Sequence, residues 1–185
     1  MKFLIILSLL FLISEFFLLL FRRSKISHRQ RGNDRGSLVL LWITITLCFT
    51  FGFTFANYNR WELWNYMTAI AGFILIIAGL IIRWLAIYQL KNAFTVDVAI
   101  AVNQKLKTDR IYKYVRHPSY LGLLLIMIGF SICMNSIISI LIIIIPIILV
   151  VLYRIRVEEK ILLEEFGADY ENYKSTTSMI FSGIY

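Results

Sequence analysis

Long apolar runs alternate with short polar segments along the whole chain. Three runs reach the ~20 residues that a helix needs to cross a bilayer, and two shorter runs follow them. The five runs occupy residues 2–21, 37–57, 67–90, 120–134 and 137–153. Only Asn135 and Ser136 separate the last two runs, so we expect a helical hairpin there. The pattern predicts an all-α, polytopic membrane protein with about five transmembrane helices in a single membrane domain.

Residues 154–173 form a different kind of segment, because they carry six of the eleven acidic residues. Apolar side chains recur among the acids at helical spacing, which predicts a C-terminal amphipathic helix outside the membrane. Gly167 is expected to end or bend this helix. The acids are Glu158, Glu159, Glu164, Glu165, Asp169 and Glu171, and the apolar positions are Val157, Ile161, Leu162 and Phe166. Such a helix presents either a solvated acidic face or acids that act in a site.

The basic residues are divided unequally between the two sides of the predicted membrane. Residues 22–36 and 91–117 hold six Lys or Arg each and the C-terminal segment holds four, which makes sixteen, whereas only Lys2 and Arg60 lie on the other side. Because Lys and Arg concentrate in cytoplasmic loops, we expect the basic segments in the cytoplasm and the N-terminus outside. The expected location is a multi-pass integral membrane protein, in the cell membrane if the source is bacterial.

The composition is typical of a membrane protein rather than a soluble one. The chain has 185 residues, is 59% hydrophobic and has a mean hydropathy of +0.77. Its net charge of +8 does not indicate a nucleic-acid partner, because the basic residues lie between apolar runs. Membrane lipids are the expected partners, and the basic segments suit anionic head groups. The sequence carries no signal for the oligomeric state.

Few residues suit metal or redox chemistry. His28 and His117 are the only histidines, so a metal site is not expected. Cys48 and Cys133 lie inside apolar runs, where we expect them to fill space. The sequence has no Gly-rich dinucleotide motif, no P-loop and no Gly-x-Ser-x-Gly motif.

Two charged residues lie within predicted spans. For Glu15, in the first run, we favour an inward-facing or interfacial acid with a local partner over a functional group. Arg83 lies near the polar end of the third run, where it either extends to the interface or faces a cofactor pocket.

The junction at residues 116–122 is the strongest candidate for a site. Pro118 suits the first turn of a helix, so the free N–H groups and the positive end of that helix face the polar side. Arg116 and His117 lie just outside this end and suit an anion such as a carboxylate or phosphate. Gly122 leaves room for a ligand or another helix. The alternative is an interfacial arginine that marks the cytoplasmic end of a span.

Two motifs resemble those of the isoprenylcysteine carboxyl methyltransferases, a family of integral membrane enzymes. The first runs from Leu106 to Gly122, and the second begins with Arg-Val-Glu-Glu at residues 156–159 and continues to Tyr173. The resemblance covers roughly residues 85–180, so residues 1–66 are interpreted as two N-terminal spans and residues 67–185 as a catalytic core.

The resemblance implies that S-adenosylmethionine binds at the cytosolic face, in a pocket lined by both motifs. It places Arg156, with Arg154, near the methyl acceptor, and gives Glu159 a part in catalysis. Tyr170 and Tyr173 are expected to pack or hydrogen-bond around the site. The residues implied in the cofactor pocket are Tyr112, Arg116, His117, Pro118, Tyr120, Gly122, Glu158, Glu159 and Tyr170.

The implied reaction is the methylation of a carboxylate on a lipid-like acceptor. A carboxylate is already ionised and needs no general base, so the site must exclude water, hold the anion and align it. The family's acceptor is a lipid-tailed cysteine, which would enter from the bilayer; a small isoprenoid acid or thiol is an alternative. The chain departs from the family pattern at Gln104 and Asp109-Arg110 and lacks a proline at 176–180, so the acceptor's identity stays open.

Three other functions are compatible with the sequence. A phospholipid N-methyltransferase would share the cofactor and use a glutamate as base. An NADPH-dependent sterol-type reductase typically has Asn after Arg-His-Pro, so Ser119 and the acidic pair Glu158-Glu159 favour methyl transfer. A non-catalytic membrane scaffold is the third alternative, and the departures at Asp109-Arg110 support it.

Overall fold

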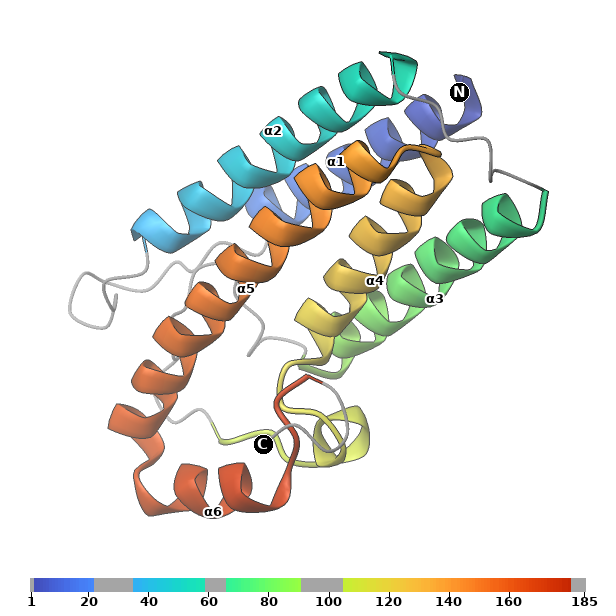
Figure 1. The fold of residues 1–185 in the computed structure, drawn as a ribbon. Helices are drawn as coiled ribbons and strands as arrows, with labels where there is room; N and C mark the ends of the chain where they lie inside the picture. The colour runs from blue at the N-terminus through green and yellow to red at the C-terminus, as the bar shows by residue number, and fades with distance from the viewer. Residues whose placement is uncertain (1, 22–34, 59–65, 91–104, 181–185) are drawn as a thin grey trace.

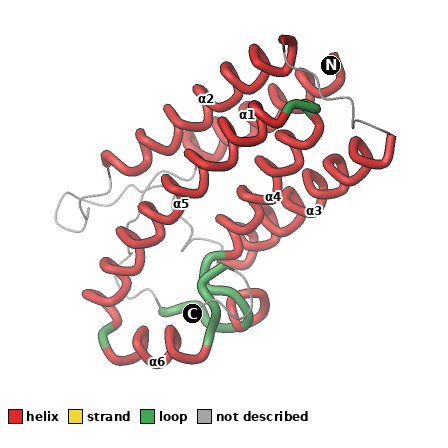
Figure 2. The backbone as a smooth tube through the Cα atoms, in the orientation of Figure 1, coloured by secondary structure: helices red, strands yellow, loops and turns green. Residues whose placement is uncertain are grey.

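A computed structural model describes residues 2–21, 35–58, 66–90 and 105–180, and every regular element within these ranges is a helix (Figures 1 and 2). The helices are α1 (Lys2–Phe21), α2 (Arg35–Tyr58), α3 (Tyr66–Leu90), the short 3-10 helix η2 (Arg110–Lys113), α4 (Pro118–Cys133), α5 (Ile137–Phe166) and α6 (Ala168–Thr176). The prediction of an all-α fold is confirmed for these parts of the chain.

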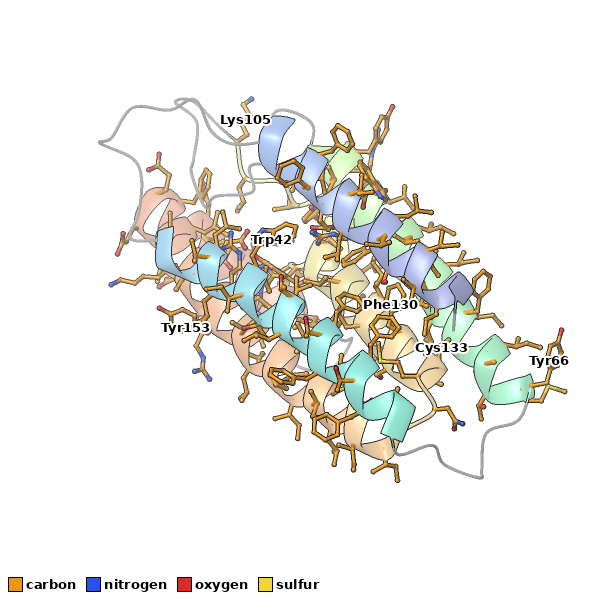
Figure 3. All side chains as sticks on the ribbon, turned by 90° about the horizontal axis from the view of Figure 1, so that it is seen from above. Trp42, Tyr66, Lys105, Phe130, Cys133 and Tyr153 are labelled. Atoms are coloured by element: carbon orange, nitrogen blue, oxygen red, sulfur yellow. The ribbon has the colours of Figure 1, made fainter. Side chains whose placement is uncertain are left out.

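The five long helices lie side by side and alternate in direction (Figure 1). The most extensive packing pairs α3 with α4 and α2 with α5, and α4 packs on α5 to join the two pairs. The C-terminal ends of α1, α3 and α5 therefore lie at the same end of the bundle as the N-terminal ends of α2 and α4. Lys105 and Tyr66 lie toward opposite ends in Figure 3.

Three of the helices are long and apolar enough to cross a membrane, within Gly36–Ala56, Tyr66–Leu90 and Ile137–Phe166. Two shorter apolar helices, Leu4–Leu18 and Pro118–Cys133, accompany them. Large apolar side chains on several helices are exposed, as expected of a surface that faces lipid; Leu10, Ile74 and Leu149 are examples. These properties support a membrane protein, and the crossing of the bilayer by all five helices stays a prediction.

The turn between α4 and α5 is as tight as predicted. Asn135 adopts a left-handed conformation with φ 53°, which asparagine tolerates better than most residues. Ser136 caps α5, since its side chain accepts a hydrogen bond from the Ser139 backbone N–H at 3.3 Å. The predicted hairpin is confirmed.

Helix α5 is longer than the sequence pattern predicts. It continues without a break from Ile137 to Phe166 and so includes most of the segment predicted as a separate amphipathic helix. Gly167, with φ 52°, ends α5 as expected, and α6 follows at once. The first part of the acidic segment is therefore a direct extension of the last apolar helix, which fixes where Glu158 and Glu159 lie relative to α4.

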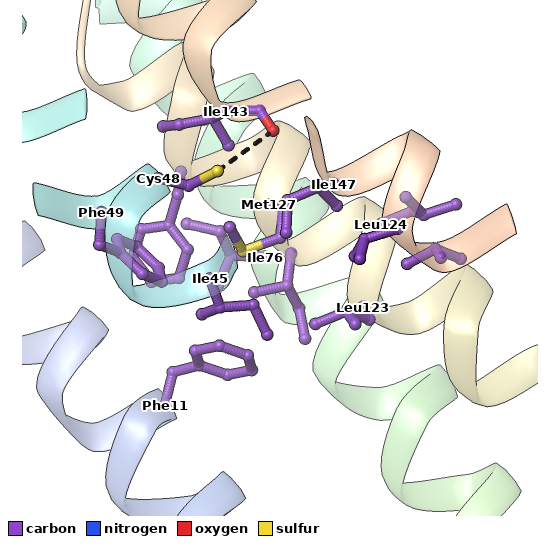
Figure 4. Close-up of a cluster of buried hydrophobic side chains, with 14 of the residues drawn as sticks. Phe11, Ile45, Cys48, Phe49, Ile76, Leu123, Leu124, Met127, Ile143 and Ile147 are labelled. Carbon is purple, nitrogen blue, oxygen red and sulfur yellow. Dashed lines mark hydrogen bonds between the residues drawn. The ribbon is translucent and has the colours of Figure 1, made fainter. Parts of the chain in front are cut away.

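The buried core lies where α1, α2, α4 and α5 meet. The Phe11 ring is 6.3 Å, between centroids, from both Phe49 and Phe130, and the last two meet edge to face at 5.1 Å. Cys48 lies in the same cluster, with its Sγ 3.8 Å from the carbonyl oxygen of Ile143 (Figure 4). Cys48 thus fills space in the core, as its place in an apolar run predicts.

Glycines bring α3 and α4 close together at two levels. A Cβ at Gly79 would lie 2.6 Å from the carbonyl oxygen of Gly122, and one at Gly129 would lie 2.5 Å from that of Gly72. Small residues allow such close approach of membrane helices. A Cβ at Gly122 would lie 2.7 Å from the backbone nitrogen of Arg83. Since α3 fills the space beside Gly122, this residue packs the two helices together, and its placement in the cofactor pocket stays a prediction.

Replacing Gly122 with Ala is expected to destabilise the bundle. The new Cβ would meet backbone atoms of α3, which cannot turn aside as a flexible side chain can, so the two helices must separate. We expect a loss of about 1–3 kcal/mol in the free energy of unfolding, seen as a lower Tm in detergent. Gly36→Ala is the matched control, because a Cβ there meets nothing within 4 Å. Equal Tm values for the two variants would contradict this account.

Candidate active site

The candidate site lies at the end of the bundle where α4 begins (Figure 1). There the C-terminal segment runs beside the residues that precede α4, and Val115 and Ser178 form a parallel bridge. The backbone N–H of Arg116 donates to Ser178 O at 2.9 Å, and that of His117 donates to Met179 O at 3.1 Å. These bonds fix the start of the Arg-His-Pro motif against a segment some sixty residues later.

Pro118 is the first residue of α4, as predicted, and His117 is its N-cap residue. The His117 side chain makes no capping hydrogen bond. It turns instead toward α5, where Nε2 lies 3.2 Å from Oε1 of Glu159. Pro118 is buried and shapes the start of the helix, and its place in the cofactor pocket stays a prediction.

Glu159 is the centre of a largely buried ionic cluster, in which Lys174 is the exposed member. Its Oε1 accepts a hydrogen bond from Nε of Arg116 at 3.1 Å and also faces His117. Its Oε2 lies 3.1 Å from Nζ of Lys174 on α6. The Arg116 side chain is only 2% exposed, and its Nη1 donates to the carbonyl oxygens of Lys174 and Thr177.

The anion expected at the junction is thus a carboxylate of the protein itself. Arg116 binds Glu159 and the backbone at the C-terminal end of α6, so it holds the two motifs together. Because a guanidinium has donors in a fixed planar arrangement, it can satisfy all of these acceptors at once.

Glu158 is less enclosed than its neighbour. Its side chain is 29% exposed, and its Oε2 lies 3.9 Å from Nδ1 of His117. The structure therefore brings Arg116, His117, Glu158 and Glu159 together, as the resemblance implies, but it gives the two glutamates different surroundings.

The two arginines of α5 face different ways. Arg154 is 3% exposed, and its Nε donates to the Tyr120 hydroxyl at 2.8 Å while its Nη1 donates to Ser37 Oγ at 2.9 Å. Arg156 is exposed. Residues two apart on a helix are separated by about 200° around its axis, so only one of them can face α4. The inward residue is Arg154, whereas a place near the methyl acceptor stays a prediction for both arginines.

Three tyrosines pack beside the cluster. The Tyr173 hydroxyl donates to Tyr112 O at 2.5 Å, and the Tyr112 hydroxyl donates to Ala86 O at 3.2 Å. Tyr170 packs edge to face against Tyr173, with centroids 6.2 Å apart. Burial, followed by the charge of Glu159, raises the pKa of the Tyr170 hydroxyl, which is therefore a neutral donor at physiological pH.

The Tyr170 hydroxyl differs from the other two, because it is buried and forms no hydrogen bond of normal geometry with any residue that the structure describes. The Glu159 carboxylate acts on this pKa through its charge and through a hydrogen-bonding interaction that falls outside normal geometry. A buried donor with so poor an acceptor is costly, so a ligand that supplies a better one would be favoured at this position.

Sequence reasoning missed two polar residues that touch the site. Lys174 contacts Glu159 from α6, and Ser37 contacts Arg154 from the start of α2. Neither belongs to a motif, and no spacing rule relates Ser37 to a residue 117 positions later. Their roles come from the packing of α2 and α6 against α5.

Comparison with known proteins relates the chain to membrane methyltransferases. The family model described as phospholipid methyltransferase matches residues 67–169, which is more than half of the chain. The chain is 34% identical over 111 residues to the protein-S-isoprenylcysteine O-methyltransferase of Schizosaccharomyces pombe. It is 28% identical over 148 residues to the protein of the same name from Saccharomyces cerevisiae.

These alignments cover 59% and 78% of this chain but only 46% and 62% of the two yeast proteins. The chain thus spans about half to three fifths of the length of these relatives. A solved structure of the eukaryotic intramembrane Ras methyltransferase, isoprenylcysteine carboxyl methyltransferase, matches with a TM-score of 0.59 and 23% identity. This match covers 86% of this chain and 55% of that one, and it shows a shared fold.

Proposed function

Because this chain belongs to the phospholipid methyltransferase family, and because its resemblance to the isoprenylcysteine carboxyl methyltransferases is confirmed, we propose that it transfers a methyl group from S-adenosylmethionine to a lipid-like acceptor. The preferred acceptor is the carboxylate of an isoprenylcysteine or a related isoprenoid acid. The observation that carries this proposal is the buried cluster in which Glu159, from one motif, contacts Arg116 and His117 from the other.

The residues around the cluster fit S-adenosylmethionine, which supplies an electrophilic methyl group on a sulfonium when it is bound. The Tyr170 hydroxyl is a buried donor whose interaction with Glu159 falls outside normal hydrogen-bond geometry, so it can donate to a ligand. Glu158 is partly exposed, so its carboxylate can accept hydrogen bonds from the cofactor's amino or hydroxyl groups and offset its positive charge. We assign these contacts to Tyr170, Glu158 and His117, whereas Arg116 and Glu159 hold the contact residues in place.

Arg154 is the proposed clamp for the acceptor. It is buried among α2, α4 and α5, and it binds the hydroxyl of Tyr120, whose ring centroid lies 5.9 Å from that of His117. An arginine can hold a carboxylate through two N–H groups, and a dry site strengthens that contact. Tyr120 thereby joins the cofactor side of the site to the acceptor side.

The site is proposed to face the cytoplasm. It lies at the end of the bundle where α1 and α3 end and α2 and α4 begin, and the polar segments at those ends are the basic ones. A lipid-tailed acceptor would enter between the helices from the bilayer, with its polar end at this level. Under the positive-inside rule the N-terminus is then outside.

Methylation of an aminolipid is the second candidate, and the description of the matching family model favours it. An amine must lose its proton before it attacks, so a base is required. Glu158 is the carboxylate near the site that is open to such a ligand. Methylation of a phosphatidylethanolamine vesicle, without methylation of a prenylated cysteine, would replace the carboxylate proposal with this one.

Calorimetric titration of the detergent-purified protein with S-adenosylmethionine tests the proposed function, with NADPH as the control. We expect saturable binding of S-adenosylmethionine alone, followed by methylation of a prenylated N-acetylcysteine in liposomes. Binding of NADPH instead would indicate a reductase. Binding of neither by folded protein would overturn the assignment to the methyltransferases and favour a scaffold.

A further inference from the structure

Two charged residues outside the cofactor cluster form a buried ion pair between α1 and α3. Arg83 and Glu15 have side chains that are 9% and 8% exposed. Two hydrogen bonds join them, from Nε to Oε1 and from Nη2 to Oε2, both at 2.5 Å. The local partner expected for Glu15 is therefore Arg83, which faces inward instead of extending to the interface.

The remaining terminal nitrogen of Arg83 reaches α4. Nη1 donates to the carbonyl oxygen of Ser119 at 3.1 Å and to its hydroxyl oxygen at 3.0 Å. Ser119 lies in the first turn of α4, between Pro118 and Tyr120. The Arg83 backbone packs against Gly122 in the same helix, so Arg83 holds the beginning of α4 through both its backbone and its side chain.

The start of α4 depends on such external contacts. Its N-cap residue, His117, uses its side chain to face Glu159 and does not cap the helix. A helix start without a side-chain cap is less stable by itself. Arg83 only donates and so does not cap the free N–H groups, but its contacts on Ser119 attach the turn that carries His117 and Tyr120 to α3.

We propose that Glu15 and Arg83 are positioning residues for the cofactor site, an inference that rests on the function proposed above. Glu15 orients the Arg83 guanidinium so that Nη1 points at Ser119. Arg83 then keeps the His117 ring in contact with Glu159 and the Tyr120 hydroxyl in contact with Arg154. A residue of α1, which lies outside the family match at residues 67–169, in this way contributes to the site.

A double-substitution cycle separates positioning from simple anchoring of α1. Glu15→Gln keeps the side chain's shape but removes its charge, and Ser119→Ala removes one acceptor of Arg83. If both substitutions act through Arg83, we expect Glu15→Gln to raise the Kd for S-adenosylmethionine about tenfold. The variant with both substitutions should then have nearly the same Kd as Glu15→Gln alone. Glu164→Gln is the matched control, because Glu164 pairs with Lys160 in an exposed contact at 4.0 Å.

Amide hydrogen exchange gives a readout that does not depend on the cofactor. The N–H groups of Tyr120 and Leu121 both donate to His117 O at 3.1 Å, so their exchange reports on the first turn of α4. We expect Glu15→Gln to speed exchange at these two amides and to leave the middle of α4 unchanged.

Wild-type Kd and wild-type first-turn exchange in Glu15→Gln, with a lower Tm, would show that the pair only anchors α1 and would overturn the proposal. Additive effects of Glu15→Gln and Ser119→Ala on Kd would also overturn it. If Glu15→Gln does not fold, Arg83→Lys replaces it, since lysine keeps the charge but cannot span both Glu15 and Ser119. If the wild type binds no S-adenosylmethionine, the proposed function fails, and the exchange data alone decide the positioning role.

Discussion

Replacing Glu159 with Gln is expected to weaken S-adenosylmethionine binding by at least about 100-fold. The Glu159 carboxylate accepts from Arg116 and faces both His117 and Lys174. A glutamine has one acceptor oxygen and adds an N–H₂ group, so at least one of these cationic or donor groups loses its partner. Hydrogen bonds to charged groups contribute about 1.5–3 kcal/mol each, and the loss of one or two matches the expected effect. Calorimetric titration measures the change in Kd.

The control for Glu159→Gln is Glu164→Gln, which removes the same charge from the exposed face of the same helix. We expect it to leave both Kd and Tm unchanged, because exposed pairs at this spacing contribute little. If Glu159→Gln keeps wild-type affinity, the ionic cluster does not organise the cofactor site. A lower Tm together with unchanged affinity would show that the cluster serves folding alone.

Replacing Arg154 with Ala is expected to lower methylation of a prenylated cysteine by at least about 100-fold, with the Kd for S-adenosylmethionine changed by less than about threefold. The cofactor contacts proposed here come from Tyr170, Glu158 and His117, so loss of the guanidinium removes no direct contact with the cofactor. Single-turnover methylation by protein saturated with S-adenosylmethionine measures the chemical step apart from cofactor affinity.

Arg156→Ala is the matched control for Arg154→Ala, because it removes the same side chain from the exposed side of α5. Its turnover is expected to stay close to wild type. Arg154→Lys should recover stability but only part of the rate, since an ammonium cannot reproduce the planar arrangement of donors. Normal turnover of Arg154→Ala, or a larger loss in Arg156→Ala, would exclude Arg154 as the acceptor clamp.

The helices were predictable because their signals are local. Apolar runs mark α1 to α5, Pro118 marks the start of α4, and Gly167 marks the end of α5. The extent of α5 was not predicted correctly. Composition changes from apolar to acidic near Arg154, but the backbone hydrogen bonding that continues a helix does not depend on that change.

Part of the candidate site was also predictable, because each motif is continuous in the sequence. Arg116 with His117, and Glu158 with Glu159, were selected from the sequence alone, and the structure brings the two pairs together. The neighbours that complete the site, Lys174 and Ser37, were not predictable, because they belong to no sequence pattern. Gly122 had two possible roles in the sequence, and the close approach of α3 shows that it packs helices together.

By itself, the sequence determined the all-helical class, the apolar helices, the two motifs and the resemblance that they carry, since each depends on residues close together in the chain. Only the tertiary structure decided that Arg154 and not Arg156 faces inward, that Glu159 contacts Arg116, and that Glu15 pairs with Arg83. These are choices among partners far apart in sequence. They depend on the rotation of each helix about its axis and on which helices pack together, and a local pattern does not encode either.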